Sequence, residues 1–371
     1  MGLKRETVIG IVGLGLMGGS LALALKARGG EKEKRRIVGV DKDPRAVRLA
    51  RETGVVDRAG EDPEEVLKGV DLLFLAVPQE EAIALVPEIS RVLPRGALVT
   101  DMASTKEGVT RAMDALPPHI TFLGGHPMTG SERQGLRAAD PFLFENAAYV
   151  LTPTEKTPRK AVETVGGLVR ELGGEVIILT PERHDQVVAA ISHLPHLLAG
   201  SLMHTVSGEG DRELAFSLAA GSFRDCTRVA VSSPRMWRRI CLDNKKALLH
   251  YLSLYGEQLA RVESLIRRGR EDELLDFFAS ARGLREELPP RGKGFLTPLF
   301  DAVVLVEDTP GIIGEMATLL GRAGVNIAEI EVLRVREAEE GSIRFGFKEQ
   351  TEREKALGLL KGAGIKAWSR E

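Results

Sequence analysis

The stretch that decides the fold reads Val8-Ile-Gly-Ile-Val12-Gly13-Leu-Gly15-Leu-Met-Gly18-Gly-Ser20. Residues 8–12 form an apolar run of strand length, and residues 18–27 follow with helical spacing. The glycines at this junction form a G-x-G-x-x-G motif: the first permits a tight turn, the second lets the backbone approach a pyrophosphate, and the third allows close helix packing. The free N–H groups of the helix would then face the phosphates. We predict that the ligand contacts Gly13, Gly15, Leu16, Met17 and Gly18.

The same stretch superficially resembles a signal peptide or a membrane anchor, because Lys4 and Arg5 precede eighteen uncharged residues, 8–25. Five of the eighteen are glycines. Each interior glycine costs a helix roughly 1 kcal/mol relative to alanine. We therefore favour the strand–turn–helix interpretation and expect a cytoplasmic protein with no membrane contact.

An acidic residue follows the next strand. Residues 37–40 are a predicted strand and Asp41 ends it, near the spacing at which a carboxylate accepts hydrogen bonds from the adenosine ribose. A carboxylate there would repel a 2′-phosphate, so NAD is favoured over NADP, although Lys42 and Arg45 lie nearby. We place Val77, at the end of the strand predicted over 72–77, in the same cofactor site. The alternative is a surface acid and a glycine turn without a ligand.

Strands and helices alternate through the first half of the chain. Further strands are predicted at 97–100, 121–123, 148–151 and 176–179, and helices at 44–53 and 80–93. This alternation predicts an α/β fold, a Rossmann-type doubly wound and mainly parallel sheet over residues 1–180. Residues 181–288 contain no convincing strand and show long helical periodicity, notably over 234–266, and Pro195 should kink one helix.

A linker is predicted over residues 289–300, because Pro289-Pro-Arg-Gly-Lys-Gly294 breaks regular structure. After it, residues 301–371 alternate in the order β-α-β-β-α-β, the ferredoxin-like α+β arrangement. The predicted elements are strand 302–306, helix 312–323, strand 325–335, strand 342–347, helix 352–361 and strand 365–368.

Length and composition limit the class of protein. A chain of 371 residues is expected to hold two or three domains, and 43% hydrophobic with 28% charged residues is the balance of a globular protein. The net charge is −2, from 51 basic and 53 acidic residues, which does not favour nucleic acid as a partner. The two cysteines, Cys226 and Cys241, suggest a reducing compartment.

His126 follows the strand predicted at 121–123. Ligands of open α/β sheets bind beyond the carboxyl ends of the strands. A neutral imidazole beside a nicotinamide suits removal of a hydroxyl proton while hydride leaves the same carbon. Ser104 follows another strand and could hydrogen-bond the substrate hydroxyl, or bond His126 and fix its tautomer. The structural alternative is that Ser104 caps a helix with Glu107 as its capping-box partner.

Further candidates lie on the helical segment. His193 and His196 are three residues apart and share a helix face with His184 and Asp185 nearby, yet no ligand set completes a metal site, and we predict none. Buried or cleft-facing histidines are the favoured interpretation. Arg224 and Arg228 stand one helical turn apart and would suit a carboxylate, or form surface ion pairs with Asp225.

Taken together, these segments resemble the prephenate/arogenate dehydrogenase family. The resemblance spans roughly residues 8–290 and keeps the family's order. It is carried by Gly13–Ser20, Asp101–Lys106, Gly125–Glu132, His184-Asp185, Ser192–His196, Phe223–Arg228 and Trp237.

The resemblance implies a role for each matching residue. His126 would take the proton from the 4-hydroxyl of the ring with Ser104 as its partner, and Arg228 would hold the ring carboxylate. His196 and Trp237 would shape the substrate pocket, with Glu132 at its mouth. We also place Arg224 among the substrate-binding residues. The implied reaction is oxidative decarboxylation of prephenate to 4-hydroxyphenylpyruvate with NAD, in tyrosine biosynthesis. The family's helical second domain forms a homodimer.

The C-terminal segment resembles an ACT domain. Glu307-Asp-Thr-Pro310-Gly311-Ile-Ile-Gly314 and Ala323-Gly-Val-Asn326-Ile327 carry this resemblance. Such domains bind amino acids at paired interfaces, so feedback by tyrosine is implied, with contacts from Pro310, Gly311 and Asn326. A domain that only dimerises is the alternative.

Three other functions compete. Arogenate could replace prephenate as the substrate. A phosphoglycerate dehydrogenase can also carry an ACT tail, but the glycine motif at the extreme N-terminus argues against that architecture. An NAD-sensing regulatory protein without turnover would make the arrangement of His126, Ser104 and Arg228 accidental.

Overall fold

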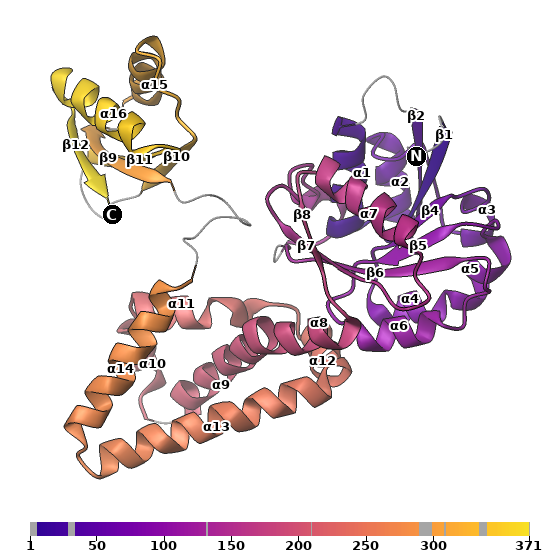
Figure 1. The fold of residues 1–371 in the computed structure, drawn as a ribbon, viewed down its shortest axis with the longest axis horizontal. Helices are drawn as coiled ribbons and strands as arrows, with labels where there is room; N and C mark the ends of the chain where they lie inside the picture. Colours follow the sequence, from indigo (N-terminus) through magenta and orange to yellow (C-terminus); the bar gives the residue numbers. More distant parts are fainter. Residues whose placement is uncertain are drawn as a thin grey trace. The chain divides into compact units, whose positions relative to one another are not determined.

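The computed structural model describes residues 6–28, 34–130, 133–208, 210–288, 299–307, 309–333 and 340–370. The chain divides into two compact units, Met1–Gly283 and Leu284–Glu371, and each is described by itself (Figure 1). The predicted fold class is confirmed: a doubly wound α/β sheet precedes a group of helices in the first unit, and the second unit is a small ferredoxin-like α+β domain.

The first unit begins with an eight-stranded sheet in the order β3-β2-β1-β4-β5-β6-β7-β8. Neighbouring strands run parallel except β6 and β7, which are antiparallel. The strands are β1 (Glu6–Val12), β2 (Lys34–Val40), β3 (Arg58–Gly60), β4 (Leu72–Leu75), β5 (Leu98–Asp101), β6 (Thr121–Pro127), β7 (Ala148–Thr152) and β8 (Glu175–Ile178). β2 and β3 lie on one side of β1, and β4 and the later strands lie on the other. The strand order therefore reverses at β1, and the turn after this strand opens at the switch point where ligands bind.

Helices cover both faces of this sheet (Figure 1). One core lies under α1 (Leu16–Arg28), α2 (Pro44–Glu52) and α7 (Arg159–Glu171). The other lies under α3 (Pro63–Val66), α4 (Gln79–Ala84), α5 (Val86–Val92) and α6 (Glu107–Met113). The prediction of a single helix over 80–93 is wrong, because this segment forms two helices, α4 and α5. Pro87, which stands in the first turn of α5, has no N–H to continue the α4 ladder.

The rest of the first unit is helical, as predicted. It comprises α8 (Pro181–Val188), a π-helical turn η2 (Ala189–His193), α9 (Leu194–Gly208), α10 (Arg212–Ser217), α11 (Gly221–Thr227), a 3₁₀ turn η3 (Arg228–Val231), α12 (Pro234–Asp243), α13 (Lys245–Arg267) and α14 (Glu271–Glu286). The kink expected at Pro195 takes the form of the π turn just before it, because proline cannot donate the next helical hydrogen bond. The helix expected over 234–266 is interrupted at Asn244.

The second unit has a four-stranded antiparallel sheet in the order β10-β11-β9-β12. Its strands are β9 (Phe300–Glu307), β10 (Glu329–Leu333), β11 (Glu340–Phe347) and β12 (Lys366–Arg370), and its helices are α15 (Ile312–Arg322) and α16 (Gln350–Gly362). Both helices pack on one face over an apolar core. The strand predicted over 325–335 begins only at Glu329. Residues 334–335 of that prediction and most of the predicted linker, 289–298, lie outside the described residues.

Candidate active site

The glycine turn after β1 is shaped for a bound phosphate. Gly13 has φ +94°, and a Cβ there would lie 2.5 Å from the carbonyl oxygen of Ala76. A Cβ on Gly18 would lie 1.9 Å from the carbonyl oxygen of Gly13. The protein itself therefore requires both glycines. At Gly15 a Cβ would meet nothing within 4 Å, so the space above this residue is open to a ligand.

The predicted neighbours of this turn are in place. Leu16 and Met17 form the first turn of α1 and are half-buried. Val77 lies against the turn, because its Cγ1 would be 2.7 Å from a Cβ on Gly13. The N-terminus of α1 thus points its free N–H groups past Gly15, which fits the pyrophosphate of a dinucleotide.

Asp41 follows β2 and is bonded to the glycine turn. Its carboxylate accepts hydrogen bonds from the backbone N–H of Leu14 at 2.6 Å and of Asp43 at 2.9 Å. The two basic residues that weakened the case for NAD are engaged elsewhere: Lys42 pairs with Glu81 at 2.6 Å and Arg45 with Asp43 at 3.2 Å. The hydrogen bond to Glu81 raises the pKa of Lys42. The carboxylate of Asp41 thus lies beside the glycine turn, as expected for a group that accepts hydrogen bonds from the adenosine ribose.

His126 lies near the end of β6, and His184 of α8 holds its ring. Nδ1 of His126 is 2.8 Å from Nε2 of His184, and the two rings meet edge to face. Burial lowers the pKa of His126 well below its usual value, and the nearby His184 and Lys106 lower it further. At neutral pH the imidazole is uncharged and available as a base.

Asp185 continues this chain of hydrogen bonds. Its carboxylate lies 2.7 Å from Nδ1 of His184 and accepts the backbone N–H of Lys106 at 2.7 Å and of Glu107 at 2.9 Å. The side chain that caps α6 therefore comes from α8, some 80 residues along the chain. Sequence reasoning noted this His-Asp pair but did not connect it to His126.

The interpretation of Ser104 as the N-cap of α6 is wrong. The helix begins at Glu107, and the orphan N–H groups of its first turn bond to Asp185. Ser104 is half-buried, and among the described residues it makes no hydrogen bond to His126. The hydrogen bond that was predicted to fix the tautomer of His126 is made by His184 instead.

A buried ion pair supports the strand that carries His126. Lys106 and Asp101 are fully buried and in contact through Nζ and Oδ2. Lys106 also donates to the carbonyl oxygen of Gly125 at 2.7 Å, and Asp101 accepts the N–H of Gly125 at 3.1 Å. Burial lowers the pKa of Lys106, and Asp101 opposes this. Because both groups bond the residue before His126, the pair fixes the backbone from which the imidazole projects.

Two further histidines, His193 and His196, contact Trp237 of α12. His196 stacks on the indole with 3.5 Å between ring centroids, and His193 meets it edge-on at 5.8 Å. His193 is buried, and burial lowers its pKa to about 4. Asn244 lies 3.1 Å from its Nδ1 and also donates to the backbone oxygen of Asp185 at 2.7 Å. His193 and His196 lie in the same continuous helical segment, α8 to α9, as His184 and Asp185.

The predicted carboxylate-binding groups are less constrained. Arg228 begins η3 and is exposed. Arg224 of α11 donates to the carbonyl oxygen of Ala219 at 3.1 Å, and the described residues show no ion pair between it and Asp225. Glu132 lies outside the described residues. The structure thus joins His126 to His184 and His196 to Trp237, and among the described residues no hydrogen bond or ion pair joins Arg228 to any of them.

Comparisons with known proteins agree with this arrangement. Residues 21–186 match the family model for the prephenate dehydrogenase nucleotide-binding domain, residues 180–280 its dimerization domain, and residues 301–357 an ACT domain. A prephenate dehydrogenase of Bacillus subtilis is 36% identical over 359 residues, which cover 96% of each chain. The chain belongs to the prephenate dehydrogenase family. A prephenate dehydrogenase of Lactococcus lactis is 31% identical over 95% of this chain and 97% of its own.

Solved structures similar to this protein cover about three quarters of the chain. The prephenate dehydrogenase of A. aeolicus, crystallised with hydroxyphenyl propionate and NAD+, has a TM-score of 0.71 and 32% identity and covers 76% of this chain and 98% of its own. A Synechocystis arogenate dehydrogenase has a TM-score of 0.68 and 34% identity, covering 76% and 99%. The predictions of an NAD-dependent dehydrogenase with a nucleotide-binding domain and an ACT domain are therefore confirmed at the level of the family.

Proposed function

We propose that this protein oxidatively decarboxylates prephenate to 4-hydroxyphenylpyruvate, with NAD as the hydride acceptor, in tyrosine biosynthesis. One observation carries the proposal: His184 holds His126 through Nδ1, burial lowers the pKa of this ring, and the described residues show no hydrogen bond to its Nε2. The open space at Gly15 and the carboxylate of Asp41 support a dinucleotide in the neighbouring turn.

Each residue then has a task in the reaction. The bound nicotinamide supplies the hydride acceptor. Nε2 of His126 takes the proton of the 4-hydroxyl as hydride leaves the same carbon, and Ser104 bonds the hydroxyl oxygen. The electron pair of the bond to the departing carboxylate enters the ring, carbon dioxide leaves, and His126 returns its proton to the phenolate oxygen. Arg228 and Arg224 would hold the anionic groups, while the stacked rings of His196 and Trp237 would form the pocket wall with Glu132 at its mouth.

The choice between prephenate and arogenate is tested by steady-state rates with both substrates and NAD. We expect a higher kcat/KM with prephenate, because cationic and aromatic groups fit a keto acid without an added ammonium charge. The background rate is measured with heat-inactivated enzyme, NAD and each substrate. A tenfold preference for arogenate would overturn the substrate assignment, and no hydride transfer with either would favour a sensor without turnover.

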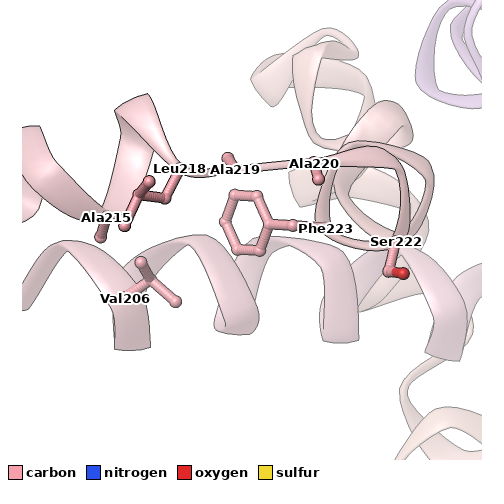
Figure 2. A pocket seen from close by; sticks show the side chains of 7 residues that line it. All are labelled: Val206, Ala215, Leu218, Ala219, Ala220, Ser222 and Phe223. Atoms are coloured by element: carbon pink, nitrogen blue, oxygen red, sulfur yellow. The ribbon is translucent and has the colours of Figure 1, made fainter.

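We propose that the helical region forms a homodimer. Several large apolar side chains there are exposed, including Val231 at 80% and Leu218 at 73% of their full areas. An apolar hollow of about 270 Å³ lies between α9, α10 and α11, where Val206, Leu218 and Phe223 face one another (Figure 2). By length and composition alone, the helical segment 181–208 is also long and apolar enough to cross a membrane. Only 22% of its most apolar 18-residue stretch is buried. A second copy is the occupant we propose for this apolar surface, since the matching family model is a dimerization domain.

The ACT unit is proposed to bind tyrosine as a feedback effector. Gly311 has φ +97° at the start of α15, and Pro310 beside it is exposed. Asn326 is exposed beyond the other end of this helix, whose eleven residues span roughly 16 Å. One amino acid is too small to contact both ends. A site built from Pro310, Gly311 and Asn326 therefore needs two ACT units, one supplying each end.

We expect tyrosine to slow the full-length enzyme and to leave a chain ending near Leu288 unaffected. The reason is that the proposed effector contacts all lie in the ACT unit, which is compact by itself. Initial rates are measured over a range of tyrosine concentrations for both proteins. Asn326→Ala in the full chain is the matched control and should keep the uninhibited rate while losing inhibition. Equal inhibition of the full and shortened chains would instead locate tyrosine in the catalytic unit.

A further inference from the structure

We infer that His184 and Asp185 set the tautomer of His126 and so direct its basic nitrogen, Nε2, toward the substrate. The two residues act as positioning groups and do not themselves touch the reacting atoms. The inference rests on the proposed function, in which His126 is the base. Both are buried, with 0% and 1% of their areas exposed, so water does not compete for their hydrogen bonds.

The direction of the chain is set at Asp185. Its carboxylate already accepts two backbone N–H groups, from Lys106 and Glu107, at 2.7 and 2.9 Å. A carboxylate that accepts two N–H groups in this way offers lone pairs to its third partner as well. The third partner, Nδ1 of His184 at 2.7 Å, must therefore carry a proton and donate it.

We infer that each of the two rings carries a single N–H group, so that each has one donor and one acceptor nitrogen. Since Nδ1 of His184 is the donor, its Nε2 accepts. The atom 2.8 Å away, Nδ1 of His126, must then be the donor. Nε2 of His126 is left with a lone pair, which is the state a general base requires. The opposite tautomer would place a proton on Nε2, which would then have no lone pair to accept the substrate's proton.

The same carboxylate also couples the tautomer to the fold around it. Asp185 caps α6, and the loop before α6 carries Ser104 and the buried Lys106. Asn244 donates to the backbone oxygen of Asp185 at 2.7 Å and holds it from the other side. The nucleotide-binding sheet and the helical region therefore have to be joined correctly before His126 acquires its reactive tautomer.

The first test is a spectrum of the unmodified full-length enzyme. The protein is labelled with ¹⁵N-histidine, and long-range ¹H–¹⁵N correlations report which ring nitrogen carries the proton. The His126 signals are assigned by their loss in His126→Asn. We expect a protonated Nδ1 and an unprotonated Nε2 at neutral pH. A proton found on Nε2 would overturn the inference, whatever the activity of the enzyme.

The second test compares two replacements of His184. His184→Phe removes the acceptor, and kcat should fall roughly 10–100-fold, a range known for the loss of residues that orient an imidazole. His184→Gln offers an amide oxygen to Nδ1 of His126, so it should recover most of the rate and the wild-type tautomer signal. His119→Phe, in a partly exposed loop before β6, is the control and should change neither.

The outcomes separate this inference from the proposed function. An unchanged kcat and an unchanged tautomer in His184→Phe would contradict the positioning role. If His184→Phe does not fold, the wild-type spectrum and the glutamine variant still decide the question. Undiminished activity in His126→Asn would remove His126 from the reaction, while the tautomer measurement would stand on its own.

Discussion

Replacing His126 with asparagine should lower kcat by about 10²–10⁴-fold, the range for losing a general base. Asparagine can hydrogen-bond a hydroxyl group but cannot take its proton at neutral pH. The affinity for NAD should not change, because the glycine turn follows β1 and Asp41 follows β2, so the proposed pyrophosphate and ribose contacts do not involve β6. Steady-state kinetics and a titration of the free enzyme with NAD measure the two quantities.

The pH profile of the wild-type enzyme is the control for this variant. Burial lowers the pKa of His126, so the ring stays neutral, and therefore basic, to a pH below the ordinary histidine range near 6.5. Accordingly, kcat/KM should be maintained through neutral pH and fall only on the acid side of that range, as the ring becomes protonated. The acid limb should be absent from His126→Asn. A variant with unchanged kcat would refute the role of this imidazole.

The second large effect is on stability. Lys106→Met should destabilise the first unit by about 3–5 kcal/mol, because it leaves the carboxylate of Asp101 buried without its partner. The same change removes the hydrogen bond to the carbonyl oxygen of Gly125, next to His126. Thermal unfolding of the full chain should show the transition of this unit lowered by roughly 6–20 °C.

The matched control makes the same substitution in an exposed ion pair. Lys156 contacts Asp114 at 2.8 Å, and their side chains are 74% and 53% exposed. Lys156→Met should cost no more than about 1 kcal/mol. Equal shifts in the two variants would mean that the buried pair does not stabilise the unit as described.

Much of the nucleotide-binding domain could be predicted because its signals are local. The turn after β1 needs glycine at Gly13 and Gly18 for steric reasons that involve nearby backbone, so the motif reports the structure directly. Buried strands such as β4 stand out as short apolar runs. The division of the helical segment after β4 into α4 and α5 could also have been predicted, because Pro87 marks the point where α5 begins.

The connections within the site were harder to predict because they join residues far apart in sequence. Ser104 and Glu107 have the spacing of a capping box, and a local reading favours that cap. In the folded protein the carboxylate of Asp185 accepts the N–H groups at the start of α6, so Ser104 does not cap this helix. No periodicity relates Asp185 to α6 or His184 to β6. The adjacent His184-Asp185 pair was the available signal, and its meaning depends on how the helical region packs on the sheet.

The most direct test is a crystal structure of the full chain with NAD+ and an unreactive substrate analogue that retains the ring hydroxyl. We predict that Nε2 of His126 lies about 2.6–3.2 Å from that hydroxyl oxygen, on the side of the ring that faces the nicotinamide. His184 should remain bonded to Nδ1. An imidazole turned toward bulk solvent, with the hydroxyl bonded to another group, would contradict the assignment of His126 as the base.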